Sequence, residues 1–232
     1  MISTLVQLQL IEQRDRWDFA SYDPGYEQVL GLIKDSNWDY YNLSNLVEFF
    51  KYGASIPADY TTEGILFIRA QNIREYGIDL SDMCYISDQT PNIDKYKSDP
   101  GDILITRSGV NVGNAAAIPE NLAGSVHGSY SIRLRLLKVK VSPDYLAVAL
   151  NSSVIKTQIL ASKGRSAQPN INIAELGALQ IPVPPLHIQE QIANEMQEAY
   201  AEARRLRTQA ENLVFEANAR VERMILGEEE VT

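Results

Sequence analysis

The 232-residue chain has one cysteine, two histidines and no long apolar run. A single cysteine, Cys84, cannot form an internal disulfide, which agrees with a reducing compartment. One cysteine and two histidines cannot supply the four ligands of an ordinary structural zinc site, so no metal is expected. No segment approaches the run of about 18 apolar residues that a membrane span needs, and the first residues lack a signal-peptide pattern. We therefore expect a cytoplasmic chain with no membrane partner.

The sequence also lacks the usual enzyme motifs. There is no Gly-x-x-x-x-Gly-Lys-Ser/Thr phosphate loop, no Gly-x-Gly-x-x-Gly and no Gly-x-Ser-x-Gly nucleophile turn. No Lys stands two residues after an acid, as in a common type of nuclease core, and the Asn/Asp-Pro-Pro-Tyr/Phe tetrapeptide of amino-methyltransferases is missing. We predict no catalytic residue and no cofactor. Hydrolysis by carboxylates alone stays open, because converging acids leave no linear motif.

The net charge of −9 is unevenly distributed along the chain. Residues 1–100 carry eight Lys or Arg against 16 Asp or Glu, whereas residues 101–165 carry eight against three. This concentration of basic residues permits an anionic partner on one face. A solvated surface of mixed charge would give the same composition, so charge alone does not decide between the two interpretations.

The hydrophobic pattern predicts an α+β class. Short apolar runs separated by Gly, Asn and Pro predict an irregular, mostly antiparallel sheet. The expected strands are 64–68, 83–86, 102–106, 115–118 and 131–139. The expected short helices are 26–34, 42–50, 143–151 and 153–162. Dense prolines up to Pro185 end the globular part, since they fit neither a helix interior nor a central strand.

A long C-terminal helix is predicted from Ile188 to about Leu226, ended by Gly227. Its apolar residues recur at alternating spacings of four and three, which is a heptad seam typical of a coiled coil. The seam consists of Ile192, Met196, Ala199, Ala203, Leu206, Ala210, Leu213 and Ala217. A helix packed on its own domain is the alternative. The expected domains are a globular domain over 1–185, the helix over 186–227 and a disordered acidic tail over 228–232.

Four segments carry a resemblance to a known family. They are Arg14-x-Arg-Trp-Asp-Phe-x-x-Tyr-x-Pro-x-Tyr26, Gly64-Ile-Leu-Phe-Ile-Arg-Ala-Gln-Asn-Ile73, Pro100-Gly-Asp-Ile-Leu-Ile-Thr-Arg-Ser-Gly109 followed by Val112-Gly-Asn-Ala115, and Ile181-Pro-Val-Pro-Pro-Leu-x-x-Gln-x-x-Ile192. In order and spacing they resemble the specificity subunits of type I restriction-modification systems. The chain is similar to a form with a single target recognition domain.

The resemblance implies a non-catalytic subunit that binds double-stranded DNA and assembles with a methyltransferase subunit and a restriction subunit. In the family, one target recognition domain reads half of a split site, and a conserved helix separates it from a second, similar domain. Only one such domain is found here. A homodimer with antiparallel helices paired through the seam would replace the second domain; a different partner chain is the competing explanation. A coiled-coil adaptor with a protein-binding head is the other function considered, and it suits the acidic charge.

The loops that follow the expected strands are rich in side chains that suit base edges and phosphates. The candidate DNA-binding residues are Arg69, Gln71, Asn72, Arg74, Thr106, Arg107, Ser108, His127, Ser129, Tyr130, Lys163, Arg165, Ser166, Gln168 and Asn170. Those assigned to base edges are Arg69, Gln71, Asn72 and Arg107, and those assigned to phosphates are Lys163 and Arg165. Each residue alone also fits an ordinary exposed polar loop. Asp102 is expected to be structural, and His187 is expected in the first turn of the long helix.

Overall fold

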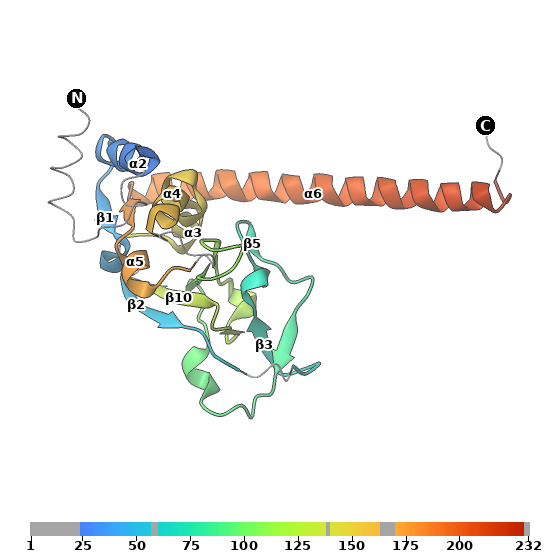
Figure 1. The fold of residues 1–232 in the computed structure, drawn as a ribbon, viewed down its shortest axis with the longest axis horizontal. Helices are drawn as coiled ribbons and strands as arrows, with labels where there is room; N and C mark the ends of the chain where they lie inside the picture. The colour runs from blue at the N-terminus through green and yellow to red at the C-terminus, as the bar shows by residue number, and fades with distance from the viewer. Residues whose placement is uncertain (1–23, 57–59, 138–139, 163–169, 230–232) are drawn as a thin grey trace. The chain divides into compact units, whose positions relative to one another are not determined.

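A computed structural model describes residues 24–56, 60–137, 140–162 and 170–229, drawn in colour in Figure 1. The chain divides into two compact units, Met1–Glu190 and Gln191–Thr232. The first unit is α+β, with antiparallel sheets and short helices, and the second consists of most of one long helix. The predicted fold class is confirmed.

The centre of the first unit is a four-stranded antiparallel sheet in the order β2-β10-β7-β8. Its strands are β2 (Val47–Tyr52), β10 (Ser131–Leu136), β7 (Ile103–Thr106) and β8 (Ala115–Ala117). All four residues of β7 are buried, which explains its continuous apolar run. In β10 apolar residues alternate with Arg133 and Arg135 along the sequence, but burial does not follow this alternation, because Arg133 is buried together with Ile132 and Leu134.

One predicted helix is wrong. Residues 42–50 form the end of β1 (Tyr40–Asn42), the short 3-10 helix η2 (Leu43–Asn45) and most of β2. Phe49 and Phe50 pair across the sheet with Arg135 and Leu134 of β10. Aromatic and β-branched residues gain more from such cross-strand packing than from a short helix, and the partner strand lies far away in the sequence.

A smaller sheet in the order β6-β3-β9 lies next to the main one in the fold. Its strands are β6 (Cys84–Ile86), β3 (Ile65–Ile68) and β9 (Val126–His127), and the β3–β9 pair is parallel. β3 leads into the 3-10 helix η3 (Ala70–Asn72) and the hairpin of β4 (Ile73–Arg74) and β5 (Gly77–Ile78). Two further 3-10 helices are η4 (Ile93–Tyr96) and η5 (Glu120–Leu122). Ile68 and Ile73 share a core cluster with Leu104 of β7, which joins this region to the central sheet.

Four short helices lie in the part of the first unit that the structure describes. They are α2 (Pro24–Lys34), α3 (Pro143–Asn151), α4 (Ser153–Ser162) and α5 (Ile173–Gly177). Three were predicted, and α3 begins where Ser142 accepts a hydrogen bond from the Tyr145 amide and Pro143 supplies a preset backbone angle. β11 (Gln180–Pro182) pairs with β1, so the dense prolines close a two-stranded edge and not a central strand.

The long helix α6 runs over Leu186–Ile225, in agreement with the predicted 188–226. At about 1.5 Å per residue its 40 residues span roughly 60 Å. Buried Gln189 anchors its first turn within the first unit: its amide oxygen accepts from Ser142 N at 2.8 Å, and its amide nitrogen donates to the carbonyl oxygens of Lys140 and Pro184. The helix ends at Gly227 in the left-handed conformation. Within the described ranges, no helix has the length and apolar character to cross a membrane.

Candidate nucleic-acid interface

Three strand ends of the first unit meet at one place. The segment after β3 and the segment before β10 are joined by the hydrogen bond from Gly128 N to Ile68 O at 3.0 Å. The segment after β7 is joined to both, because Arg107 N donates to Tyr130 O at 2.9 Å and Thr106 Oγ1 donates to Ala70 O at 3.4 Å. We call this region the loop surface; it consists of Arg69–Gln71, Arg107–Ser108, Ser129–Tyr130 and Asn170.

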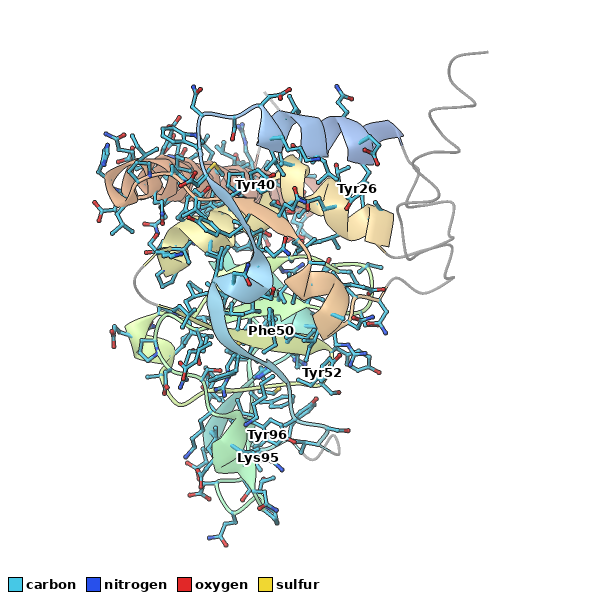
Figure 2. All side chains as sticks on the ribbon, turned by 90° about the vertical axis from the view of Figure 1, so that its left-hand side faces the viewer. Tyr26, Tyr40, Phe50, Tyr52, Lys95 and Tyr96 are labelled. Atoms are coloured by element: carbon cyan, nitrogen blue, oxygen red, sulfur yellow. The ribbon has the colours of Figure 1, made fainter. Side chains whose placement is uncertain are left out.

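Arg107 is held on the loop surface from two sides. Its guanidinium carbon lies 4.7 Å from the centre of the Tyr52 ring. Tyr52, labelled in Figure 2, is the last residue of β2. The Nε of Arg107 donates to Asn170 Oδ1 at 3.3 Å, and Ser108 and Asn170 form an isolated antiparallel bridge. Stacking on an aromatic ring leaves the edge of the guanidinium free to donate hydrogen bonds, which suits an arginine that reads a planar acceptor.

Arg69 and Gln71 share one acceptor. The carboxylate oxygen Oδ2 of Asp82 lies 2.8 Å from Arg69 Nη2 and 2.9 Å from Gln71 Nε2. The guanidinium of Arg69 also lies 6.0 Å from the centre of the Tyr60 ring. Arg69 therefore has a defined position, although its side chain is 24% exposed.

A cavity of about 460 Å³ opens on the loop surface. Arg69 and Gln71 line it together with Ser129, Tyr130, Tyr60 and Phe67. The backbone packs closely here, because a Cβ atom on Gly53 would lie 2.2 Å from Gly128 O. Glycine at position 53 thus allows the loop after β2 to fix the turn that carries Ser129 and Tyr130.

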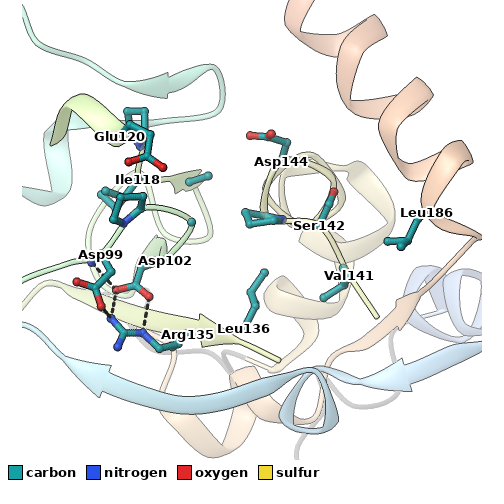
Figure 3. A pocket seen from close by; sticks show the side chains of 15 residues that line it. Asp99, Asp102, Ile118, Glu120, Arg135, Leu136, Val141, Ser142, Asp144 and Leu186 are labelled. Atoms are coloured by element: carbon teal, nitrogen blue, oxygen red, sulfur yellow. Dashed lines mark hydrogen bonds and ion pairs between the residues drawn. The ribbon is translucent and has the colours of Figure 1, made fainter. Parts of the chain in front are cut away.

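A second cavity, of about 690 Å³, lies at the opposite ends of β7 and β10 (Figure 3). Buried Asp102 accepts two hydrogen bonds of 2.9 Å from Arg135, which also pairs with Asp99. The bond to Asp102 raises the pKa of Arg135. Asp99, Glu120 and Asp144 give this cavity an acidic lining. Phosphates would be repelled there, so the two ends of the sheet differ in the ligands they suit.

The loop surface offers hydrogen-bond donors, amide groups and aromatic rings on a rigid support. Among the residues that the structure describes, no group of three or more His, Cys, Asp or Glu side chains is placed to hold a metal ion. Arginine with amide side chains and aromatics is a set that suits the edges of bases.

Comparison with known proteins agrees with this chemistry. Residues 35–214 match the family described as the type I restriction modification DNA specificity domain. The chain belongs to this family. The resemblance inferred from the four sequence segments is thereby confirmed.

Other specificity-domain proteins show the extent of the similarity. The chain is 29% identical, over 68% of its length, to the putative type I restriction enzyme MjaX specificity subunit of Methanocaldococcus jannaschii, and 23% identical, over 81%, to the type I restriction enzyme EcoBI specificity subunit of Escherichia coli. It spans 38% and 40% of those two proteins. That these relatives are named specificity subunits agrees with the prediction that the chain is not an enzyme.

Solved structures share the fold of this specificity-domain chain. The HsdS subunit from Thermoanaerobacter tengcongensis matches 75% of the chain with a TM-score of 0.56 and 21% identity, over 46% of its own length. A chain from a type I R-M system, solved in a study of complex assembly and conformational transition, matches 97% with a TM-score of 0.58 and 17% identity, over 56% of its own length. At these identities the likeness shows the fold.

Three predicted DNA contacts of the specificity domain need correction. Asn72, Thr106 and His127 are 2%, 1% and 0% exposed. Asn72 accepts from Arg69 N and donates to two backbone carbonyls, and Thr106 lies in the last position of β7. A side chain that is buried and engaged in this way supports the loop surface and cannot reach a base edge.

His127 is the clearest of these cases. Its Nδ1 lies 2.9 Å from Ser131 Oγ, within the interior. Burial, together with the nearby charge of Arg133, lowers the pKa of His127 to about 3. The ring is therefore neutral at physiological pH and contributes no charge to a phosphate site.

Of the other predicted DNA-binding residues, Arg74 is described by the structure and four are not. Arg74 lies in the β4–β5 hairpin, 3.6 Å from Asp79, and this hairpin packs along β8 at the edge of the central sheet. Lys163, Arg165, Ser166 and Gln168 lie outside the described residues, as does most of the segment that starts at Arg14. Asp102 is structural, as expected, and His187 lies in the first turn of α6.

Sequence reasoning missed Tyr52, Tyr60 and Asp82. None belongs to a motif, and each takes part in the site through a contact with an arginine. The only signal in the sequence for Tyr52 is an aromatic residue at the end of a segment of alternating character. The helix predicted over 42–50 ends just before Tyr52, so the sequence does not predict a strand that ends at this tyrosine.

Proposed function

We propose that this chain recognises double-stranded DNA through the loop surface, as the specificity component of a type I restriction-modification complex. The observation that supports this most directly is the convergence of Arg69, Gln71 and Arg107 at adjoining ends of buried strands. Strand ends hold side chains within a narrow range of positions, which base reading requires. The surface also carries Tyr130, which is 62% exposed and available for stacking or a phosphate contact.

The domain over 1–185 is proposed to be a target recognition domain that reads one half of a split site. The helix over 186–227 then acts as the spacer and the dimer contact, with the acidic residues 228–232 after it. Within the second unit, the seam residues Leu206 and Leu213 are 51% and 67% exposed. Apolar side chains repeated at this spacing are suited to pairing with another helix. Two chains related by a two-fold axis would read two inverted copies of one half-site, which makes the target a split palindrome.

The methyltransferase and restriction subunits of the system are the proposed protein partners, and they supply the chemistry. The assembled complex, and not this chain alone, is expected to bind S-adenosylmethionine. Calorimetry on the isolated chain should show no binding of that cofactor. Saturable binding near micromolar concentration would reopen the enzyme interpretation.

Mapping the methylated bases in a host that carries the intact system tests the proposal. A split palindrome is the expected result. An asymmetric motif from a complex containing only this specificity chain would refute the homodimer. Salt dependence separates DNA recognition from a coiled-coil adaptor: phosphate contacts make binding of the complex to a duplex fall steeply between about 50 and 200 mM salt. A complex that binds no duplex at the lower salt concentration would favour the adaptor.

A further inference from the structure

A single exposed carboxylate, that of Asp82, is in contact with both Arg69 and Gln71. The Asp82 side chain is 70% exposed, yet its Oδ2 lies 2.8 Å from Arg69 Nη2 and 2.9 Å from Gln71 Nε2. Both donors line the 460 Å³ cavity of the loop surface. Asp82 thus connects the two side chains of this segment that are proposed to read bases.

The position of Asp82 is fixed by the buried side chain of Asn72. The Asn72 amide nitrogen donates to Asp82 O at 2.9 Å and to Asp79 O at 3.2 Å. Asp79 Oδ1 in turn accepts from the amide and the hydroxyl of Ser81, and this lowers the pKa of Asp79. Because these bonds order the turn over 79–82, the carboxylate of Asp82 occupies a defined place even though it is exposed.

Two physical consequences follow for Arg69. Together with the Asp82 backbone carbonyl and Asn72 Oδ1, which also accept from the Arg69 guanidinium, the carboxylate restricts the rotamers of Arg69; it also restricts those of Gln71. Less conformational entropy is then lost when these side chains bind a base edge. The carboxylate also places a negative charge beside the guanidinium, which weakens attraction to phosphates. An arginine held in this way favours a specific planar acceptor over the uniform charge of the DNA backbone.

We propose that Asp82 is a positioning residue for sequence reading: it orients Arg69 and Gln71 and keeps Arg69 from binding DNA of any sequence through phosphates. This inference rests on the proposed function. According to this inference, Asp82 increases discrimination between DNA sequences and decreases the affinity for DNA of arbitrary sequence. Removing the charge should strengthen binding to arbitrary DNA while weakening discrimination.

The test compares Asp82→Asn with the wild type, each as the full chain assembled with its methyltransferase subunit. The probes are a duplex library with a randomised 30 bp core and one fixed duplex that lacks the sequence enriched from the library. For Asp82→Asn we expect the ratio of specific to non-specific affinity to fall about tenfold, the cost typical of losing one well-oriented base contact. The slope of log affinity against log salt on the fixed duplex should steepen by about 0.9, as for one additional phosphate contact.

Asp88→Asn is the matched control, because Asp88 is an exposed acid of the same unit and the substitution changes the charge equally. It should leave both the ratio and the slope near the wild-type values. Removing the partners of Asp82 adds a measurement that a purely structural role would not affect. With Arg69→Ala already present, Asp82→Asn should no longer steepen the salt slope, and with both Arg69→Ala and Gln71→Ala present it should change neither quantity further.

Three outcomes contradict the inference in different ways. If Asp82→Asn behaves like Asp88→Asn, Asp82 has no positioning role. If it only relaxes the preference at one cytosine and leaves the salt slope unchanged, Asp82 reads that base directly. If the wild-type complex binds neither the library nor the fixed duplex, the proposed function itself fails, and that failure is visible before any variant is compared.

Discussion

The guanidinium of Arg107 rests on the ring of Tyr52, with 4.7 Å between the guanidinium carbon and the ring centre. Tyr52 is the last residue of β2 and Arg107 directly follows β7, and β10 lies between those two strands in the sheet. The Tyr52 hydroxyl also accepts a hydrogen bond from Ile173 N at 3.4 Å, so the tyrosine connects three segments of the chain. This contact makes Arg107 part of a rigid support rather than a mobile loop.

Replacing Tyr52 with leucine should weaken specific DNA binding by the complex about two- to fivefold. The reason is that a cation–π contact at a partly exposed site contributes about 0.5–1 kcal/mol. Fluorescence anisotropy with the mapped site measures the change. Tyr52→Phe keeps the ring and loses only the hydroxyl, and it should bind like the wild type. Equal losses in the two variants would mean that the hydroxyl, and not the stacking, matters.

Asn72 and Gln71 are neighbours in the sequence, but Asn72 is expected to stabilise the fold and Gln71 to contribute to sequence preference. Asn72→Ala should lower the free energy of unfolding by about 1–3 kcal/mol, because it leaves buried backbone groups without their partner. Gln71→Ala should change stability by no more than about 0.5 kcal/mol, since the side chain is exposed, but it should relax sequence preference. Urea denaturation and methylation mapping measure the two effects. A stable Asn72→Ala variant with altered specificity would reverse the assignment.

The buried carboxylate of Asp102 should matter more for stability than the exposed carboxylate of Asp99. Both pair with Arg135, but Asp102 also lies 3.5 Å from buried Arg133. Asp102→Asn leaves Arg133 without a buried counter-charge and should cost about 3–5 kcal/mol. Asp99 is 64% exposed, so Asp99→Asn should cost less than about 1 kcal/mol. Similar denaturation midpoints for the two variants would contradict this account.

Stability should fall at acid pH because His127 is buried in its neutral form. Its folded pKa of about 3 lies below the unfolded value near 6.5, so the unfolded chain binds more protons between these pH values. His127 thus contributes stability that is complete above about pH 6.5 and decreases as the pH falls, by up to about 1.4 kcal/mol per pH unit. Unfolding free energies of the wild type and His127→Gln should therefore differ in slope. If the unfolding free energies of the two proteins change with pH at the same slope, His127 does not titrate as expected. His187→Gln is the control for removing a histidine.

The seam of α6 predicts a homodimer that specific substitutions should disrupt. Replacing Leu206 and Leu213 with glutamate places charges in the seam and should give monomers in sedimentation experiments. Glutamate at Ala201 and Thr208 adds the same charge at the same spacing on the face opposite the seam, and should leave the dimer intact. A wild type that is already monomeric at micromolar concentration would contradict the model of pairing.

Local patterns in the sequence were sufficient for the elements whose signals are strong by themselves. The apolar run of β7, the cap at Ser142 and the long periodic helix all depend on residues close together in the chain. Residues 42–50 could not be assigned in the same way. Their apolar side chains fit a short helix equally well, and only pairing with β10 selects the strand.

By itself, the sequence determined the fold class, the family and the segments that carry polar side chains beyond core strands. It could not determine which of those side chains face outward. Asn72 and His127 have the same polar character as Gln71 and Ser129, and only the tertiary packing buries the first pair. The contacts of Asp82 with Arg69 and of Tyr52 with Arg107 could not be predicted from the sequence either, because they depend on turn geometry and on the order of strands in the sheet. Exposure and pairing are properties of the folded surface, and residues distant in sequence decide them together.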